Sequence, residues 1–591
     1  KTIEELEADG CILLTGADVK NASAGSQQTS TGSREFVVEL NLYDEGAKKF
    51  ADATQTAYEN GYTIGIYYDN EFISVPKVSA HITDGNAVIN GMSDYQTADN
   101  IASTIRIGAL PVKLEEVRSQ VVGAKLGQDA IQTSLLAGAI GLAIIILFMI
   151  IVYRIPGLAA SIALCIYTML VLIIINVAGL TFTLPGIAGI ILSIGMAVDA
   201  NVIIFERIKE ELGTGKTVQS AMKIGFNKAF SAIFDGNITT LIAAFVLGLK
   251  GSGAVKGFAY TLAIGIIVSM FTALVVTRLL LKLFYDFGAK NEQLYGVIKD
   301  TKTFNFIGKK NIFFCISAAL ILIGIVTVSV NGARGKGMFN YGLDFKGGTS
   351  TTVTFNQDYS QAEIESTIIP DIVSAIGDST VQQQKVQGGN DVVFKTNNLT
   401  IEQREALEEL FTSKYGVEQS SILTENISGA VSNEMKTDAV IAVIIATICM
   451  LLYIWFRFKD IRFAGSAVLA LLHDVLVVVG FYAVARITLG NTFIACMLTI
   501  VGYSINATIV IFDRIRENLG QMGKADLAEI VNASISQTMR RSVYTTLTTF
   551  IMVVILFILG VSAIREFAAP LMVGIICGGY SSVCITGALW Y

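Results

Sequence analysis

Three sites of this chain place ionisable side chains inside apolar runs, where no water stabilises a charge. Asp199 lies in "GMAVDANVIIFERIKEE", Asp474 follows His473 in "ALLHDVLVVVG", and Arg541 follows Arg540 in "QTMRRSVYTTL". A charged side chain at the centre of a bilayer costs about 3 kcal/mol, so such residues are usually kept for function. Acids and an arginine at this depth predict the binding and release of protons or cations.

Both acids lie deep if their runs are helices that cross a membrane. Asp199 precedes Glu206 by seven residues, or about 10 Å of helix. Asp474 is twelve residues from Arg462 and twelve from Arg486, or about 18 Å from the charge at either end. A carboxylate there must be protonated, paired or hydrated. The alternative for each acid is structural, as a hydrogen-bonding tie between two helices.

Two polar pairs are weaker candidates, and one of them is the arginine pair named above. Asp235 and Asn237 in "IFDGNITTLI" come early in their apolar run, and structural hydrogen bonding explains them as well as function does. Arg540 and Arg541 begin a run without charges that ends at Arg565. Both arginines could therefore extend to the cytoplasmic edge instead of facing the interior.

No motif for nucleotide hydrolysis, nucleophilic catalysis or metal binding is found in the sequence. It lacks a G-x-x-x-x-G-K-[ST] loop, a G-x-S-x-G turn, an H-E-x-x-H pair and a Cys/His cluster with metal spacing. The glycine pair in "FKGGTSTTVTF" precedes a strand pattern and predicts a tight turn. We predict a protein that is not an enzyme and that has no metal site.

The elements that must position these residues are membrane spans. The chain has 591 residues, of which 52% are hydrophobic and only 16% charged, too apolar a composition for a soluble protein. A helix of about 20 apolar residues crosses a bilayer, and eleven such runs occur. They lie near 131 to 153, 157 to 180, 183 to 205, 229 to 249, 257 to 277, 311 to 330, 437 to 457, 463 to 485, 489 to 512, 542 to 562 and 568 to 591.

The distribution of basic residues predicts the orientation. Lys and Arg cluster in loops that fall on one side if the spans alternate, such as "ERIKEELGTGK" and "FDRIRENLGQMGK". The positive-inside rule makes this side the cytoplasm, so two long polar segments, 1 to 127 and 331 to 435, lie outside. Each mixes strand-like and helical patterns and predicts a small α+β domain. We expect a further span before Lys1.

The chain repeats itself. When "IIFERIKEEL" is aligned on "VIFDRIRENL", Arg207 falls on Arg514, an offset of 307 residues (514 − 207), and "NITTLIAAF" falls on "VYTTLTTF". Each half supplies an outside domain followed by five spans, and the second half shows one more span before its domain. The sequence predicts a multi-span α-helical membrane protein, a parallel six-plus-six bundle without its first span.

The predicted boundaries follow from these runs. They are an outside domain at 1–127, a first bundle half at 128–283, a cytoplasmic linker at 284–310, a span at 311–330, a second outside domain at 331–435 and a second bundle half at 436–591.

The sequence resembles the bacterial SecDF family of protein-export subunits, which belongs to the wider RND superfamily. The motifs that carry the resemblance are "LTGADVKNA" (15 to 23), "GALPVKLEE" (108 to 116), "GMAVDANVIIFERIKEE", "FDGNITTLI", "YGLDFKGGT" (341 to 349), "LLHDVLVVVG" (471 to 480), "VGYSINATIVIFDRIREN" and "ISQTMRRSVYTTLTT" (535 to 549). They are specific, ordered and spread over nearly the whole chain.

The resemblance implies a function and partners. A SecDF protein uses the proton-motive force, or sodium in some members, to pull a preprotein outward after it leaves the SecYEG channel. The implied partners are SecYEG, the unfolded preprotein and the insertase YidC, with membrane lipids around the spans and no nucleic acid. The chain would lie in the bacterial cytoplasmic membrane, need no cofactor beyond H⁺ or Na⁺, and carry ferredoxin-like folds in both outside domains.

The resemblance also implies roles for single residues. Asp199 matches the acid of the proton path in the first half, and Arg541 matches the arginine in the second. We add Asp474 to this relay because of its depth in its own apolar run. The supporting polar residues are Asn201, Asp235, Asn237, His473, Asn506 and Arg540.

One position departs from the family pattern. The acid of the second half should follow Asn506, but Ala507 stands there, and its spacing of 34 residues to Arg541 (541 − 507) fits the family. An alanine can neither hold a proton nor pair with an arginine. The residue is either a deliberate inactivating substitution or a natural variant in which Asp199 or Asp474 carries the ion alone.

Two other functions remain open at this stage. One is an RND-type exporter of hydrophobic small molecules or lipids, which the shared bundle plan allows. The other is a scaffold that stabilises the translocon without transporting ions, which the alanine at position 507 favours if it is natural.

Overall fold

The computed structural model describes residues 6, 9–28, 34–68, 71–92, 94–108, 116–122, 124–251, 253–298, 302–335, 337–385, 390–522 and 525–591. They form two compact units, Lys1–Glu116 and Val117–Tyr591. Most of the "GALPVKLEE" motif, residues 109–115, lies outside the described residues.

The first unit is a small α+β domain. Its elements are η1 (Gly16–Asp18), β1 (Val19–Gln28), β2 (Arg34–Leu42), α2 (Asp44–Asn60), β3 (Ile66–Tyr68), β4 (Glu71–Ser74), β5 (Asn86–Met92) and α3 (Tyr95–Gly108). The sheet has the order β1-β2-β5 with antiparallel neighbours, and β3 and β4 form a separate hairpin. Small residues of α3, Ala98 and Ala102, pack on Ala22 and Val38 of the sheet. Among the described residues, this domain lacks the β-α-β-β-α-β order expected for a ferredoxin-like fold.

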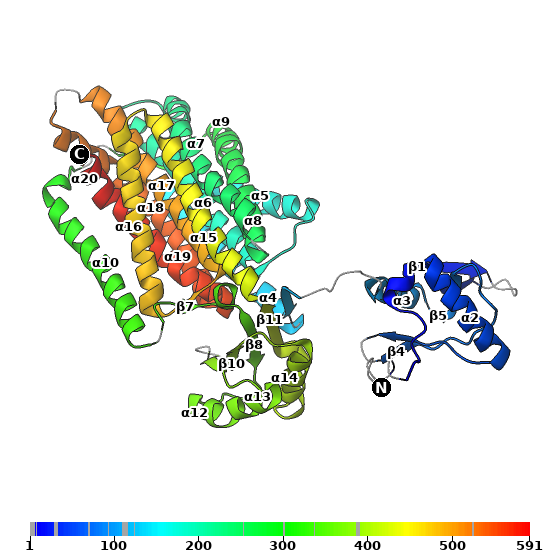
Figure 1. Cartoon of the computed structure of the whole chain (residues 1–591). Coiled ribbons are helices and arrows are strands. Elements are labelled where there is room, and N and C mark those ends of the chain that lie inside the picture. Colours follow the sequence, from blue (N-terminus) through cyan, green and yellow to red (C-terminus); the bar gives the residue numbers. More distant parts are fainter. Residues whose placement is uncertain are drawn as a thin grey trace. The chain divides into compact units, whose positions relative to one another are not determined.

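The second unit contains the membrane spans, and the prediction of eleven is confirmed for the described residues. Figure 1 shows them as a bundle of long helices. The helices of the first half are α4 (Ala124–Tyr153), α5 (Ile155–Val177), α6 (Leu184–Gly213), α7 (Val218–Lys250) and α8 (Ala254–Phe271), which continues through the π-helical turn η2 (Thr272–Val276) into α9 (Thr277–Asp286).

The second half repeats this series. Short turns η3 (Glu292–Leu294) and η4 (Ile307–Lys309) lead into α10 (Lys310–Ala333). After the second domain come α15 (Gly429–Phe458), α16 (Ile461–Ala485), β12 (Thr488–Leu489), α17 (Asn491–Gln521), α18 (Leu527–Leu559) and α19 (Ser562–Ser581), which continues through the π-helical turn η7 (Ser582–Thr586) into α20 (Gly587–Trp590). A π-helical turn interrupts the last span of each half, as the duplication leads one to expect.

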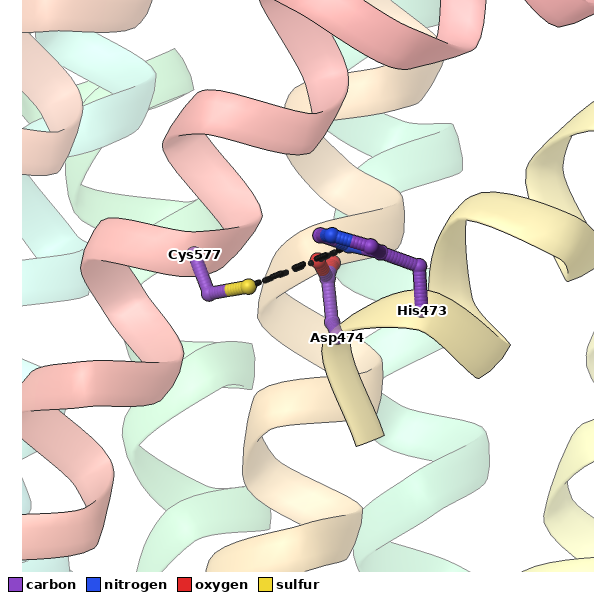
Figure 2. Close-up of side chains that lie close together, drawn as sticks. All are labelled: His473, Asp474 and Cys577. Carbon is purple, nitrogen blue, oxygen red and sulfur yellow. Dashed lines mark hydrogen bonds and ion pairs between the residues drawn. The ribbon is translucent and has the colours of Figure 1, made fainter. Parts of the chain in front are cut away.

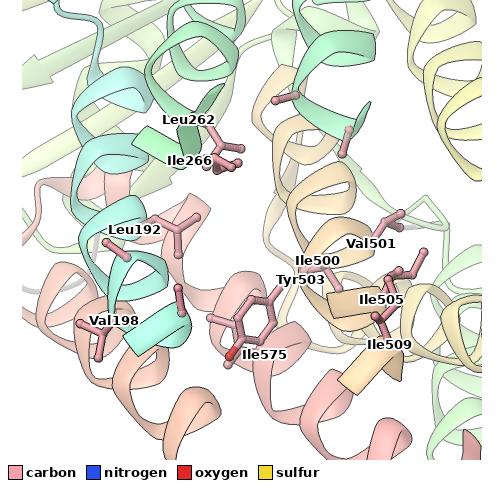
Figure 3. Close-up of a cluster of buried hydrophobic side chains, with 14 of the residues drawn as sticks. Leu192, Val198, Leu262, Ile266, Ile500, Val501, Tyr503, Ile505, Ile509 and Ile575 are labelled. Carbon is pink, nitrogen blue, oxygen red and sulfur yellow. The ribbon is translucent and has the colours of Figure 1, made fainter. Parts of the chain in front are cut away.

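Helices α6 and α17 form the centre of the bundle. Their most apolar windows are 94% and 89% buried, against 11% for the span that contains α10. Figure 3 shows part of the core around them, with Leu192 and Val198 of α6, Leu262 of α8, Tyr503 of α17 and Ile575 of α19. Polar side chains on these two helices therefore face protein and not lipid.

The second polar domain has the expected ferredoxin-like order. Its elements are β7 (Asn340–Tyr341), α11 (Leu343–Lys346), β8 (Gly348–Thr354), α12 (Gln361–Glu363), η5 (Ile364–Ile368), α13 (Ile369–Ile376), β9 (Gln382–Lys385), β10 (Asp391–Thr396), α14 (Ile401–Ser413), η6 (Gln419–Ser421) and β11 (Ile422–Ile427). Buried and partly exposed residues alternate along β10, and the inward side chains Val392 and Phe394 pack on Ile372 and Phe411 of the helices.

One boundary differs from the prediction. The sheet order is β6-β11-β8-β10-β9, and its edge strand β6 (Arg118–Val122) pairs antiparallel with β11. Residues 117–122 therefore belong with the second polar domain, and the first domain ends at Glu116 instead of residue 127. No sequence pattern indicated this, because a strand adjacent to a domain in space can come from a distant part of the chain.

The glycine pair forms the predicted turn. Gly347 and Gly348 have φ values of 76° and 114°, which L-residues with a side chain rarely adopt. A Cβ on Gly348 would also lie 2.4 Å from the Thr396 carbonyl oxygen. The pair thus ends α11 and begins β8.

Candidate ion-relay site

A small cavity lies between the central helices α6 and α17 and the neighbouring helix α18. Its volume is about 10 Å³, close to what one water molecule requires. The residues that line it are Asp199, Ile203, Tyr503, Asn506, Ala507, Val510, Arg541, Ser542 and Thr545. The sequence-predicted acid of the first half, the arginine of the second half and the departing alanine thus meet at one place.

Asp199 lies near the midpoint of α6 and is 4% exposed. The helix begins with Pro185 in its first turn and with Thr183, whose side chain accepts a hydrogen bond from the Gly186 N–H at 3.1 Å. The only hydrogen bond to the Asp199 carboxylate from the described residues is a long one, 3.5 Å from the Thr548 hydroxyl to Oδ1. A carboxyl group so weakly bonded can exchange a proton without breaking a strong contact.

Arg541 lies on α18, is 7% exposed and has no salt bridge to any described residue. Its Nε and Nη2 atoms are buried and have no hydrogen-bond partner among the described residues. Unpaired donors of a buried cation are destabilising. They face a cavity in which Ala507 occupies the position where the family pattern has a carboxylate.

Arg540 and Arg541 have different surroundings although they are neighbours. Arg540 is exposed, donates from Nε to the Tyr544 hydroxyl at 3.3 Å and lies over the same ring. It therefore extends to the edge as an amphipathic side chain does, whereas Arg541 points into the cavity.

A ring of four charges joins α6 and α17 beyond the cavity, toward their C-terminal ends. Arg207 reaches Glu517 at 2.7 Å and Arg514 reaches Glu210 at 2.8 Å, while each arginine also contacts the glutamate of its own helix at 3.0 Å. Arg207 and Arg514 are the residues that the repeat alignment superposes. The ring is thus symmetric between the halves. The repeat in the sequence aligned the two arginines but did not predict that they contact the same two glutamates.

Asp235 is a structural tie between two helices. Its carboxylate accepts from Arg457 Nε at 2.6 Å and from the Tyr453 hydroxyl at 2.9 Å, both on α15. A carboxylate held by an arginine and a tyrosine favours the structural alternative that the sequence left open.

The two asparagines of the first half bond to their own helices. The Asn237 side chain donates to the Ile233 carbonyl at 2.8 Å and that of Asn201 to the Ala197 carbonyl at 3.3 Å. Neither lines the cavity. Asn506 does, and it packs so closely on α7 that a Cβ on Gly236 would lie 1.9 Å from its Oδ1.

Asp474 belongs to a separate polar cluster. It is fully buried on α16, and its Oδ1 lies 2.9 Å from His473 Nδ1 and 3.2 Å from Cys577 Sγ of α19. Figure 2 shows the three side chains converging. Its Oδ2 accepts from Ser581 at 2.8 Å and from Ser504 of α17. Asp474 does not line the cavity, and its part in the relay stays a prediction.

Sequence reasoning missed the partners of both acids. Thr548, Ser504, Ser581 and Cys577 carry no charge, and hydroxyls and thiols are common in membrane helices, so nothing in the sequence singled them out. The spacing of seven residues that places Thr548 and Arg541 on the same side of α18 could be read from the sequence, since seven residues make about two turns.

Comparisons with known proteins agree with this architecture. A family profile described as protein export membrane protein SecD/SecF, C-terminal, matches residues 106–286 and 407–591. Profiles described as SecDF, P1 head subdomain, and SecD/SecF GG motif match residues 6–112 and 339–358.

Individual relatives match nearly the whole chain. The protein translocase subunit SecDF of Bacillus subtilis (strain 168) is 37% identical over 99% of this chain and 82% of the relative. That of Thermus thermophilus is 38% identical over 99% of this chain and 78% of the relative. A crystal structure of SecDF from Thermus thermophilus, described as a translocon-associated membrane protein, covers 100% of this chain and 80% of its own with a TM-score of 0.75 and 37% identity.

Proposed function

The chain belongs to the SecDF family of protein translocase subunits, and on that premise we propose that it uses an ion gradient to pull preproteins outward from the SecYEG channel. It is a multi-pass membrane protein and a transport subunit, not an enzyme. The observation that carries the proposal is that Asp199 and Arg541 line the same water-sized cavity at the centre of the bundle.

A proton on Asp199 changes the force between α6 and α18. The ionised carboxylate attracts Arg541 in a medium of low dielectric, and the protonated one does not. One charge that crosses 100 mV gains about 2.3 kcal/mol, whereas full reversal of a two-state equilibrium takes about 5.5 kcal/mol. One proton per step therefore biases the conformation, and a pH gradient or a second ion completes the change.

The cavity favours H⁺ over Na⁺ as the coupling ion. The lining offers one carboxylate and several uncharged oxygens, which belong to Tyr503, Asn506, Ser542 and Thr545. A sodium ion among them would share the cavity with the Arg541 guanidinium, which repels it. A proton requires only the carboxylate oxygen and a path for water.

A shift of the central helix can reach the second polar domain directly. Asp344 of α11 accepts from the backbone N–H of Asn491, the first residue of α17, at 2.8 Å. Strand β7 of that domain also pairs in parallel with β12, which immediately precedes α17. We place this domain outside the cytoplasm, since the basic loops lie at the other ends of the same helices, and there it would act on the emerging preprotein, with YidC as a neighbour.

The test is preprotein export in inverted membrane vesicles that contain SecYEG, with and without this chain, under an imposed gradient of H⁺ or of Na⁺. We expect the chain to accelerate export only when the H⁺ gradient is present. Acceleration by Na⁺ alone would overturn the choice of ion. Acceleration that is independent of both gradients would contradict the proposal.

That last outcome would favour a non-transporting scaffold, the second candidate. Two observations support it: Ala507 stands where the family pattern has an acid, and two nitrogens of Arg541 have no partner among the described residues. A relay with one acid instead of two could be inactive. Efflux of lipids or drugs without any effect on export would favour an exporter instead.

A further inference from the structure

The cluster around Asp474 brings together three side chains of types that bind metals, outside the cavity that Asp199 and Arg541 line. His473, Asp474 and Cys577 are 8%, 0% and 6% exposed, and their ligand atoms all lie within 4.8 Å of one another. They come from two helices, α16 and α19, and Figure 2 shows all three directed at a common point.

The spacing suits a tetrahedral metal ion. The separations are 2.9 Å from Nδ1 to Oδ1, 3.2 Å from Sγ to Oδ1 and 3.9 Å from Sγ to Nδ1. Zinc binds nitrogen and oxygen at about 2.0 Å and sulfur at about 2.3 Å, which in a tetrahedron separates the ligand atoms by about 3.3 to 3.5 Å. Shifts of about 0.4 Å would therefore close the three ligands around an ion.

The surroundings resemble those of a supported metal site. The other carboxylate oxygen of Asp474 accepts from Ser504 and Ser581, and these hydrogen bonds fix its orientation. The Nδ1 atom of His473 faces both of the other ligand atoms, so this ring nitrogen is the one available to an ion.

We propose that His473, Asp474 and Cys577 form a binding site for a borderline transition-metal ion of the Zn²⁺ class, distinct from the relay cavity. The set of nitrogen, sulfur and oxygen donors is typical of zinc and unlike the all-oxygen sites of Mg²⁺ or Ca²⁺. Binding replaces the S–H bond of Cys577 with a metal–sulfur bond and releases one proton to solvent. With one carboxylate and one thiolate, the occupied site has no net charge, which suits a low-dielectric environment.

Such an ion would join α16 to α19. The relay cavity is lined by residues of α6, α17 and α18 and contains none of the three ligands, so the metal would act on the packing of the second half and not on Asp199 itself. We therefore expect bound metal to slow conformational exchange and to reduce gradient-driven export without removing the relay.

The test uses the purified full chain in detergent after treatment with a chelator. Titration with Co²⁺ should give a thiolate-to-cobalt charge-transfer band in the near ultraviolet, and competition with Zn²⁺ should give one site per chain. Cys577→Ser should abolish the band, and His473→Gln and Asp474→Asn should each weaken Zn²⁺ binding by more than about 100-fold. Ser504→Ala should weaken it by about tenfold, through the carboxylate.

Cys584→Ser is the matched control, since Cys584 lies about two turns further along the same span and should leave the band unchanged. Melting temperatures without metal show whether each variant is folded. The proposal is overturned if the wild type gives no thiolate band or if folded Cys577→Ser retains it. Export assays with and without chelator separate the two proposals. If the proposed function is wrong, gradient-driven export is absent with chelator as well as without it.

Discussion

The two central helices are equivalent at one end and different in the middle. Toward their C-terminal ends, α6 and α17 exchange the same contact in both directions, 2.7 Å from Arg207 to Glu517 and 2.8 Å from Arg514 to Glu210. Halfway along, α6 contributes a buried carboxylate, Asp199, whereas α17 contributes Ala507 to the same cavity.

The charge ring is present in both copies of the repeat, whereas the acid of the proposed relay is present in only one. A symmetric ring of charges holds two repeated helices together and works best when both copies keep it. A proton carrier needs only one acid next to one cation, so the second copy can lose its acid while the packing survives. In the cavity that Ala507 lines, two nitrogens of Arg541 have no partner among the described residues.

Removal of the remaining acid should have the largest effect. Asp199→Asn keeps the size of the side chain but cannot exchange a proton, so we expect gradient-dependent export to fall on the order of 100-fold, the contribution of a positioned proton-transfer group. Export rates in vesicles under an H⁺ gradient measure this. Asp235→Asn is the matched control at a similar depth. It weakens the contact between α7 and α15 and should lower the melting temperature, while export should still respond to the gradient.

Restoration of the second acid should have the next largest effect. Ala507→Asp places a carboxylate beside the unpaired nitrogens of Arg541, and pairing a buried charge stabilises a protein by up to about 3 kcal/mol. We expect a higher melting temperature and faster gradient-driven export. Ala507→Asn supplies the volume without the charge. If it raised the melting temperature and the export rate as much as Ala507→Asp does, the difference between the middles of α6 and α17 would not depend on charge.

The charge ring should respond equally from either half. Glu210→Gln and Glu517→Gln each remove one acid of the ring, and we expect each to destabilise the protein by about 1 kcal/mol because the ring is partly exposed. Thermal melts of the two single variants and the double variant provide the measurement. A loss of stability in only one of the two single variants would show that the two equivalent glutamates contribute unequally, although their contacts match.

The smallest effect is expected at the N-terminal ends of the two helices, where the caps differ. The Thr183 hydroxyl caps α6, whereas Asp344 of the second polar domain accepts from the first N–H of α17. Burial raises the pKa of Asp344 above its ordinary value of 3.8. Its contribution to stability is therefore complete below that value and declines as the pH rises through the raised pKa.

Melting temperatures from about pH 4 to about pH 7 test this. The difference between the wild type and Asp344→Asn should shift in favour of the variant as the pH rises, whereas Thr183→Ala should cost about 1 kcal/mol at every pH. A pH-independent difference at Asp344 would contradict the assignment.

The sequence predicted the spans and the repeat well, because both depend on local pattern. Runs of about 20 apolar residues have few alternatives to a membrane helix, and the aligned arginines do meet in the ring. The sequence also pointed to Asp199 and Arg541, since charges in an apolar run are conspicuous, and the spacing of motifs located the departure at Ala507.

Contacts between distant segments were beyond its reach. Strand β6 joins a sheet whose other strands begin more than 200 residues later (348 − 122), and no local pattern announces this pairing. The sequence likewise showed no metal spacing, because Cys577 lies 103 residues from Asp474. Asp235 looked like a candidate for function until its partners Arg457 and Tyr453 were seen to satisfy it.

The most direct test of the proton relay is proton flux through the purified chain in liposomes that carry SecYEG, a preprotein and a pH-sensitive dye inside. The wild type should admit protons when an H⁺ gradient is imposed and preprotein is present, and Asp199→Asn should not. Equal proton flux in the two proteins would contradict the claim that Asp199 carries the proton.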